Sequence, residues 1–343
     1  MRTDIGGKGQ AMLKGKVVVV TGASAGVGRA TVRELARRGA HVGLIARGTD
    51  RLEAAAAEVR AAGSRACVAP ADVSDAEALE QAAQRIESAL GPIDVWVNSA
   101  MTAVLAEVAD TSPAEFKRVT EVTYLGSVHG AQVALRRMLP RDAGVIVQVG
   151  SALGRRGIPL QATYCASKHA IKGFADSLRA ELLHHDSNVR FTLVQMPGLN
   201  TPQFGWVRTR LHRHPQPVPP VYQPEVAARA IVHAAEHPRR EYWVGGSTVY
   251  TILGEKFISG LMDIYLARTN EQAQQADIAI DPEQRDDNLF EPPAGDRGAH
   301  GRFDAKAHPR SPQWWLNTHR SLVAAMAAGV AVTVAASRRY GPL

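Results

Sequence analysis

The 343-residue sequence contains only two cysteines, Cys67 and Cys165. Two cysteines cannot build the disulfide framework that stabilises small secreted domains, so we expect a protein of the reducing cytoplasm. The first 16 residues are polar and glycine-rich and lack the apolar core of a secretory signal peptide. The sequence therefore predicts a cytoplasmic location.

A continuous basic stripe is also lacking, although the formal net charge is +7. Residues 201–240 hold six arginines against two glutamates, whereas residues 271–310 hold nine acidic against five basic residues. Nucleic-acid-binding proteins cluster their basic residues with interleaved aromatics or carry a known binding module. Neither pattern is found, so we expect no nucleic-acid partner, and we assign no metal site.

Long apolar runs are absent apart from residues 321–337, which carry no charge and lie between Arg320 and Arg338–Arg339. As a helix this segment would span about 25 Å, short of the roughly 30 Å hydrocarbon core of a bilayer. A helix that is apolar on all sides must be buried, whether against its own domain, a partner subunit or a membrane. We favour burial against protein and keep membrane association through residues 321–337 open.

With 45% hydrophobic and 21% charged residues, the composition is that of a globular protein. Up to residue 246, short β-branched runs alternate with longer helical patterns, which predicts βαβ units and a parallel sheet. Several of these runs are apolar throughout, as expected for strands covered on both faces. The predicted fold is α/β, a doubly wound parallel sheet of the Rossmann type. Its strands are expected at 16–20, 41–46, 65–69, 93–98, 144–149, 189–195 and 241–244, and its helices at 26–38, 50–62, 75–90, 112–138, 164–185 and 224–236.

Beyond residue 246 the composition changes and predicts a C-terminal helical extension. Residues 247–268 place large apolar side chains at helical spacing, which is typical of an amphipathic helix packed on the domain or on a second subunit. Residues 269–319 are polar, contain proline and glycine and have no apolar period, so we expect a mobile linker. We therefore divide the chain into a flexible N-terminus (1–14), an α/β domain (15–246), an amphipathic helix (247–268), a linker (269–319) and an apolar helix (320–343).

Residues 21–28 read Thr-Gly-Ala-Ser-Ala-Gly-Val-Gly and join the first predicted strand to the first predicted helix. Three glycines allow a tight turn, close approach of the backbone to a pyrophosphate and close packing of helix on strand. The N–H groups at the start of a helix and the helix dipole favour a phosphate. The position of this variant motif after a strand favours dinucleotide binding over a plain glycine turn.

The end of the second predicted strand indicates which dinucleotide is bound. An Asp or Glu normally lies there and holds the adenosine ribose 2′-hydroxyl. Here Ala46 occupies that position and Arg47 follows it. Because an arginine can pair with a 2′-phosphate through charge-assisted hydrogen bonds, the sequence favours NADP(H) over NAD(H).

Three side chains form a candidate catalytic group. Ser151 follows a buried strand, and Tyr164 begins a helix on which Lys168 lies one turn later on the same face. A phenol has a pKa near 10, which is too high for acid–base work at neutral pH, and a nearby ammonium lowers it. The serine hydroxyl can hydrogen-bond a substrate oxygen as charge develops on it.

In combination, these features resemble the short-chain dehydrogenase/reductase family. Further matching positions are Asp72-Val73, Asn98-Ser99-Ala100 and Pro197-Gly198 with Thr201, in the family's order and spacing over residues 15–246. The resemblance implies an oxidoreductase that transfers a hydride between a nicotinamide and a carbonyl or alcohol substrate.

The resemblance also implies a role for each matching residue. Tyr164 would be the acid/base, Lys168 would lower its pKa and bind the nicotinamide ribose, and Ser151 would orient the substrate oxygen. Asp72 would contact the adenine, and the segment from Pro197 to Thr201 would border the nicotinamide. The cofactor-binding set implied in this way is Thr21, Gly22, Ser24, Gly26, Val27, Gly28, Arg47, Asp72, Val73, Asn98, Ala100, Tyr164, Lys168, Pro197, Gly198 and Thr201.

The sequence departs from the family pattern at two positions. Met101 stands where the family's Asn-Asn-Ala-Gly segment has glycine, which puts a thioether near the cofactor cleft. Thr123 occupies the position of an asparagine that supports a water-mediated proton relay. We expect Thr123 to take part in catalysis, because a threonine hydroxyl also donates and accepts hydrogen bonds.

Two loops are expected to set substrate specificity, because ligands bind at the carboxyl ends of parallel strands. Residues 152–159 carry Arg155 and Arg156, and residues 199–222 carry aromatic, histidine and arginine side chains. This combination suggests a hydrophobic small-molecule carbonyl or alcohol with an anionic group, although the arginines could simply be solvated. The resemblance further implies a homodimer or homotetramer formed through the helices at 112–138 and 164–185.

A second hypothesis is a non-catalytic, NADP-binding redox regulator that acts through its C-terminal extension. Thr123 and the length of the extension motivate this alternative. The intact Ser151, Tyr164 and Lys168 argue against it, because a sensor has no need of all three. We therefore expect an enzyme.

Overall fold

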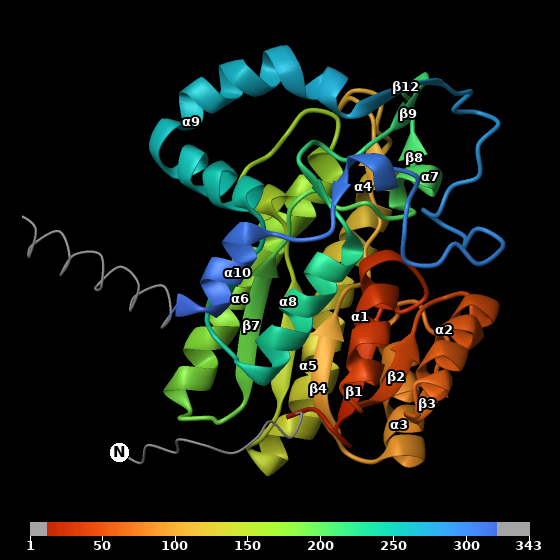
Figure 1. The fold of residues 1–343 in the computed structure, drawn as a ribbon, viewed down its shortest axis with the longest axis vertical. Coiled ribbons are helices and arrows are strands. Elements are labelled where there is room, and N and C mark those ends of the chain that lie inside the picture. Colours follow the sequence, from red (N-terminus) through yellow and green to blue (C-terminus); the bar gives the residue numbers. More distant parts are fainter. Residues whose placement is uncertain (1–11, 321–343) are drawn as a thin grey trace, which may run out of the picture.

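A computed structural model describes residues 12–320 and contains a seven-stranded, all-parallel sheet (Figure 1). The strands follow one another in space in the order β11-β7-β6-β4-β1-β2-β3. The order reverses between β1 and β4, which opens a crevice at their carboxyl ends. The strands are β1 (Val17–Thr21), β2 (His41–Ile45), β3 (Ala66–Val68), β4 (Ile93–Asn98), β6 (Val145–Val149), β7 (Arg190–Gln195) and β11 (Glu241–Trp243).

Helices cover both faces of the sheet, so the predicted doubly wound fold is confirmed. One face packs against α1 (Gly26–Arg37), α2 (Thr49–Ala61) and α8 (Pro224–Glu236). The other face packs against α3 (Ala76–Leu90), α5 (Gly126–Met138) and α6 (Ala162–His184).

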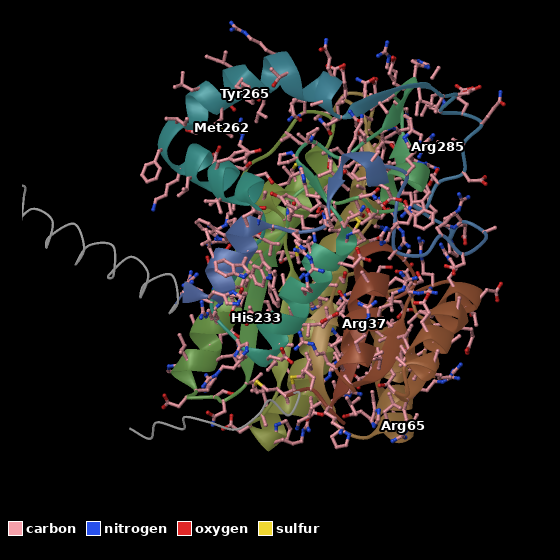
Figure 2. All side chains as sticks on the ribbon, viewed as in Figure 1. Arg37, Arg65, His233, Met262, Tyr265 and Arg285 are labelled. Carbon is pink, nitrogen blue, oxygen red and sulfur yellow. The ribbon has the colours of Figure 1, made fainter. Side chains whose placement is uncertain are left out.

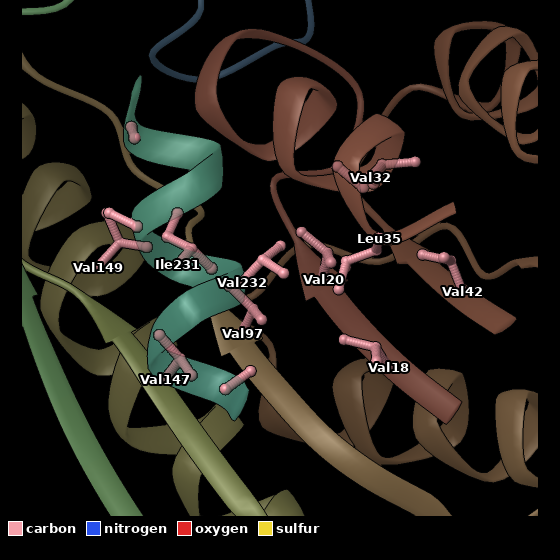
Figure 3. Close-up of a cluster of buried hydrophobic side chains, with 14 of the residues drawn as sticks. Val18, Val20, Val32, Leu35, Val42, Val97, Val147, Val149, Ile231 and Val232 are labelled. Atoms are coloured by element: carbon pink, nitrogen blue, oxygen red, sulfur yellow. The ribbon is translucent and has the colours of Figure 1, made fainter. Parts of the chain in front are cut away.

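The strand sequences explain these two layers, because successive side chains of a strand point to opposite faces. Val18 and Val20 of β1 lie in the cluster with α1 and α8, whereas Val17 and Val19 lie in the cluster on the opposite face. Figure 3 shows Val18 and Val20 beside side chains of α1 and α8. Since both faces are buried, an uninterrupted valine run is the expected sequence for β1.

The helix predicted over 112–138 contains a change of helical type. It consists of α4 (Pro113–Val119), a π-helical segment (Thr120–Leu125) and α5. Such wider turns are rare and occur frequently at functional sites. Helix α4 begins with a capping box in which the Ser112 hydroxyl and the Glu115 carboxylate each accept a hydrogen bond from the other residue's backbone N–H.

The predicted mobile linker at 269–319 is wrong, because this region is folded onto the domain. The amphipathic helix is longer than predicted, α9 (Gly246–Ala273), and β12 (Gln275–Ala279) then pairs with β9 (Arg213–Pro215). Further along, β13 (Ala307–His308) pairs with β10 (Val221–Tyr222), and α10 (Pro312–Thr318) follows. Leu289, Ala299, Phe303 and Trp314 are buried one at a time, without a regular period, so the sequence pattern did not reveal them.

The remaining elements are short and border the carboxyl edge of the sheet or connect larger elements. They are β5 (Val104–Leu105), β8 (Arg208–Thr209), α7 (Gln203–Trp206) and the 3-10 turns at Leu139–Arg141, Ala152–Gly154 and Asp304–Lys306.

Both ends of the predicted domain map extend beyond the described residues. Residues 1–11 and 321–343 lie outside them, and so does nearly all of the apolar helix predicted at 320–343. Within the N-terminal stretch predicted to be flexible, Leu13 is buried and the Gly15 N–H donates to the Gly39 carbonyl at 2.9 Å. Over residues 12–320, no helix combines the length and the apolar character needed to cross a bilayer.

Candidate active site

A cavity of about 840 Å³ runs from the glycine-rich loop along the carboxyl ends of the central strands to α9. All the site residues predicted from the sequence line it except Thr21, Asn98 and Thr123. The sequence therefore located this cavity correctly, although it did not identify all of its walls.

The glycine-rich loop forms a cradle whose glycines are required by close backbone contacts. A Cβ on Gly28 would lie 2.1 Å from the Gly22 carbonyl oxygen, and one on Gly22 would lie 2.9 Å from the Ala100 Cα. Gly22 also has a φ of +69°, a conformation that favours glycine. The loop leads into the N-terminus of α1 at Gly26, where a helix favours an anionic group. These features fit the pyrophosphate of a dinucleotide.

Thr21 and Asn98 lie behind this cradle and position it. The Thr21 hydroxyl oxygen accepts hydrogen bonds from the N–H groups of Ser99 and Ala100, at 3.0 and 3.2 Å. The Asn98 side-chain amide is buried and bonds to the Trp96 indole, the Ser127 carbonyl and Gln148. Thr21 thus joins the end of β1 to the segment after β4, whereas Asn98 joins the end of β4 to α5 and β6. Neither side chain lines the cavity.

The cavity end expected to hold the adenine carries a partly buried ion pair between Asp72 and Arg118. Burial acts to raise the pKa of Asp72, but hydrogen bonds from Arg118 and Ser74 outweigh it and lower that pKa. Arg118 also donates to the Leu289 carbonyl at 3.0 Å. This end of the cavity is therefore built partly by the C-terminal region, which the sequence analysis treated as a linker.

Arg47 lies at the carboxyl end of β2, as predicted, but the C-terminal region already contacts it. Its guanidinium donates to the carbonyls of Asn288 and Phe290, at 2.6 Å each. Burial lowers the pKa of Arg47. Neutral carbonyls leave its positive charge uncompensated, so this charge remains available to an anion.

Ser151, Tyr164 and Lys168 meet in the middle of the cavity. Ser151 follows β6 and accepts from the Leu153 N–H at 3.1 Å, and its side chain acts to lower the pKa of Tyr164. On α6, the ammonium of Lys168 lies 5.6 Å from the centre of the Tyr164 ring and donates to the Val149 carbonyl at 2.8 Å. The structure thus brings the three predicted side chains together.

The pKa of Tyr164 is shifted upward, whereas the sequence analysis predicted a downward shift. Burial raises it to about 12, and the influence of the Ser151 side chain acts in the other direction without outweighing it. Burial also lowers the pKa of Lys168 to about 8, because desolvation disfavours an ammonium. The prediction that Lys168 holds the phenol pKa low is therefore wrong for the chain taken by itself. At neutral pH, the phenol is protonated and able to donate.

The Thr123 side chain is hydrogen-bonded to the backbone and does not line the cavity. It is fully buried in the π-helical segment, where its hydroxyl donates to the Thr102 carbonyl at 2.9 Å and accepts from the Thr102 N–H at 3.1 Å. With both contacts made to one neighbouring residue, this side chain fixes the loop after β4. Met101, the other departure from the family pattern, does line the cavity.

The arginines of the two predicted specificity loops form ion pairs with carboxylates. Arg155 pairs with Glu241 at 2.7 Å, Arg156 with Glu255 at 2.6 Å and Arg210 with Glu115 at 2.8 Å. Arg208 and Arg213 are likewise paired, with Asp287 and Asp277. The anionic substrate group suggested by the sequence therefore loses its support, because these cations already have carboxylate partners.

The wall facing the catalytic group is mainly apolar, and part of it was missed. Phe204, Trp206 and Val207 line it, as expected from the loop after β7. The α9 side chains Tyr250, Met262, Tyr265 and Leu266 also line it, and Figure 2 labels Met262 and Tyr265 on this helix. The amphipathic period revealed the helix, but no signal in the sequence indicated that it borders the cavity.

Comparison with known proteins bears on this geometry. Residues 16–210 match the family model described as short chain dehydrogenase. The chain belongs to the short-chain dehydrogenase/reductase family. Its members are oxidoreductases that use a nicotinamide dinucleotide, which agrees with the glycine cradle and the Ser-Tyr-Lys group.

Individual relatives of this short-chain dehydrogenase/reductase extend the comparison. An uncharacterized oxidoreductase, YxnA, of Bacillus subtilis is 32% identical over 95% of this chain and 92% of its own length. A fatty acyl-CoA reductase of Acinetobacter baylyi is 32% identical over 66% of this chain and 76% of its own length. The bovine dehydrogenase/reductase SDR family member 7B is 35% identical over 52% of this chain and 57% of its own. The Bacillus alignment includes most of the region beyond residue 246, so that region has a counterpart in a relative.

Proposed function

We propose that this protein is an NADP(H)-dependent reductase of hydrophobic carbonyl compounds. The observation that carries the proposal is the protonated Tyr164 phenol, which lines one cavity with Ser151 and Lys168, with a dinucleotide cradle at one end. When bound, the nicotinamide supplies the hydride. Arg47 and the lack of an acidic residue at position 46 support NADP(H) over NAD(H).

Each of the three side chains has a distinct task in this reaction. Ser151 donates to the carbonyl oxygen and orients it. Tyr164 delivers the proton to that oxygen, which a phenol with a raised pKa can do at neutral pH. Lys168 places a positive charge near the phenol and stabilises the phenolate left after proton transfer.

The substrate class follows from the walls of the cavity. Aromatic and aliphatic side chains of α7 and α9 border the space beyond the catalytic group. Because the arginines of the specificity loops are paired, an uncharged apolar chain suits this wall best. The fatty acyl-CoA reductase among the relatives supports a substrate with a long apolar chain.

The test is NADPH oxidation by the full chain and by Tyr164→Phe with a panel of aliphatic aldehydes of increasing length. General acid catalysis contributes about 10²–10⁴-fold, so the variant should lose activity by that factor and bind NADPH with unchanged affinity. Wild-type activity in the variant would contradict the proposal. NADPH binding without turnover of any carbonyl in the wild type would favour the redox regulator instead.

A further inference from the structure

Arg51 in the first turns of α2 has a buried guanidinium with no anionic partner. Its side chain is 7% exposed and lines the cavity, and its guanidinium lies 5.5 Å from the centre of the Trp206 ring. Within residues 12–320, this guanidinium makes no hydrogen bond and no ion pair. A charge buried in this way is costly unless an anion compensates it. Burial lowers the pKa of Arg51, and the charge of Asp296, which is itself paired with Arg29, acts in the other direction without outweighing burial.

The neighbouring arginines have hydrogen-bond partners within the protein. Arg29 and Arg33 both bind the Glu58 carboxylate, and Arg118 binds Asp72. Arg47 has carbonyl oxygens as partners. Of these arginines, Arg47 and Arg51 line the cavity, and over the described residues 12–320 Arg51 is the one of the two whose guanidinium has no hydrogen-bond partner.

The position of Arg51 indicates which anion this is. Arg29 donates to the carbonyl of Ser24 at 3.3 Å and to that of Arg51 at 3.0 Å, which ties the glycine-rich loop to the first turns of α2. Ser24, Arg47 and Arg51 therefore line the same end of the cavity. In a bound dinucleotide, the adenosine ribose lies between the loops after β1 and β2.

We propose that Arg51 binds the 2′-phosphate of NADP(H) directly, as a second cation beside Arg47. This inference rests on the proposed function, because it needs NADP(H) to be the cofactor. A phosphomonoester would give the Arg51 guanidinium the charge-assisted hydrogen bonds it lacks. The Trp206 ring, 5.5 Å from the guanidinium, helps to keep the Arg51 side chain at this position.

Calorimetric binding of 2′,5′-ADP and 5′-ADP to the full chain tests this, since the two probes differ by the 2′-phosphate. Hydrogen bonds to charged groups contribute about 1.5–3 kcal/mol, so Arg51→Gln should weaken 2′,5′-ADP about 10- to 100-fold. Its affinity for 5′-ADP should stay within about threefold. Arg51→Lys should keep part of the preference for 2′,5′-ADP over 5′-ADP. The control is Arg65→Gln, at an exposed arginine just before β3, and it should keep the whole preference.

The outcomes separate this inference from the proposed function. Equal binding of both probes by the wild type would overturn the choice of NADP(H). A wild type that prefers 2′,5′-ADP and an Arg51→Gln variant with the same preference would overturn the role of Arg51 alone. Thermal unfolding of each variant shows whether it is folded, and Arg51→Lys provides the test if Arg51→Gln is not.

A second, independent observation concerns α9, many of whose large apolar side chains are exposed. Glu255 and Asp263 form ion pairs with Arg156 of the domain. In contrast, seven large apolar side chains of this helix are 40–72% exposed, namely Tyr250, Leu253, Phe257, Ile258, Leu261, Ile264 and Tyr265. A surface helix normally has the opposite arrangement. Contiguous exposed apolar patches mark interaction sites.

This apolar patch of α9 is continuous with the mouth of the cavity. Tyr250 and Tyr265 are half-exposed and also line the cavity. The helix is kinked at Ile258 and arches beyond the carboxyl end of the sheet (Figure 1). An apolar substrate could therefore pass from the partner of this patch into the cavity without crossing water.

The continuation of the chain indicates what the partner is. Helix α10 packs against α9, exposes Trp315 and Leu316, and ends two residues before Arg320. The sequence then continues into the uncharged residues 321–337, followed by Arg338 and Arg339. Apolar segments flanked by basic residues are typical of contact with anionic bilayers.

We propose that the apolar patch of α9 docks on the surface of an anionic lipid bilayer, from which the enzyme takes its substrate. Phe257 and Leu261 are the most exposed side chains of the patch and would enter the acyl boundary. The ion pairs of Glu255 and Asp263 with Arg156 compensate the two carboxylates nearest to these side chains, which lessens their repulsion of anionic headgroups.

Flotation of the full chain with vesicles of phosphatidylcholine and anionic phosphatidylglycerol tests this proposal. Replacing Phe257 and Leu261 together by serine should lower the bound fraction about tenfold or more, because two buried apolar side chains are lost. The matched control replaces Met12 and Val108, two apolar residues outside α9 with 60% and 64% exposure, and should bind like the wild type.

Three results would overturn the bilayer proposal. One is a wild type that does not float with these vesicles. Another is an α9 variant that floats as well as the wild type, which would place any attachment elsewhere. The third is a smaller particle in sedimentation for the α9 variant than for the wild type, which would make a second copy of the chain the partner.

Discussion

Tyr164 and Lys168 are two titratable side chains whose pKa values burial moves in opposite directions. The phenol rises to about 12 and the ammonium falls to about 8. At neutral pH the pair therefore holds a proton on the phenol and a positive charge on the amine. Carbonyl reduction begins from this protonation state. The state is lost when either residue loses its proton, which happens at a different pH for each.

We predict that kcat/KM for carbonyl reduction falls as the pH rises through about 8. Lys168 is charged below its pKa and loses its charge above it, while Tyr164 stays protonated until about 12. A rate profile from about pH 6 to pH 10 measures this. Lys168→Arg, which stays charged, should flatten the profile whatever its absolute rate. A flat wild-type profile would contradict the assignment.

Arg47 gives a second prediction at this scale. Arg47→Asp should shift the preference from NADP(H) toward NAD(H), because attraction to a 2′-phosphate becomes repulsion. The ratio of kcat/KM for the two cofactors measures the shift. The variant also removes the hydrogen bonds to Asn288 and Phe290, so its thermal unfolding has to be followed in parallel. An unchanged ratio in a folded variant would contradict the role of Arg47.

The segment from residue 285 to residue 304 forms contacts with the cavity loops that the expected fold did not include. The Gly298 carbonyl accepts from the Gly26 N–H of the glycine-rich loop at 3.0 Å. The Asn200 side chain accepts from the Phe303 N–H at 2.9 Å and donates to Asp304 at 2.8 Å. The segment thus joins the phosphate-binding end of the cavity to the loop that follows Pro197.

The tight contact at Gly301 makes this packing testable. A Cβ there would lie 2.5 Å from the Thr201 carbonyl oxygen, and backbone cannot move aside as a flexible side chain can. Gly301→Ala should lower the free energy of unfolding by about 1–3 kcal/mol, as overpacking does. Gly157→Ala, where a Cβ meets open space, is the control and should be nearly neutral. Urea unfolding measures both, and equal stability of the two variants would contradict the contact.

At the scale of the whole molecule, we predict a dimer or tetramer formed through α5 and α6. Membership of the short-chain dehydrogenase/reductase family favours this association, and α6 ends with an exposed Leu183. Sedimentation velocity at micromolar concentration measures the mass of the particle. A monomer there would contradict the prediction. The same experiment on the α9 variant separates this interface from the apolar patch of α9.

The sequence by itself determined the parallel sheet, the glycine-rich loop and the Ser-Tyr-Lys group. Each depends on a pattern within a short stretch, such as the valine run of β1 or the spacing of Tyr164 and Lys168 on one helix face. Local geometry fixes such patterns, so they can be read without knowledge of distant contacts.

Only the tertiary structure decided the partners of the charged groups and the place of the C-terminal region. Arg47 meets a carbonyl 241 residues away, and Arg156 meets carboxylates about a hundred residues away. Likewise, the side chains of α9 have a helical period, but its orientation was set by the ion pairs with Arg156. Such pairings depend on how whole elements pack, and burial also reversed the pKa shift expected for Tyr164, because the cost of desolvation exists only in the folded chain.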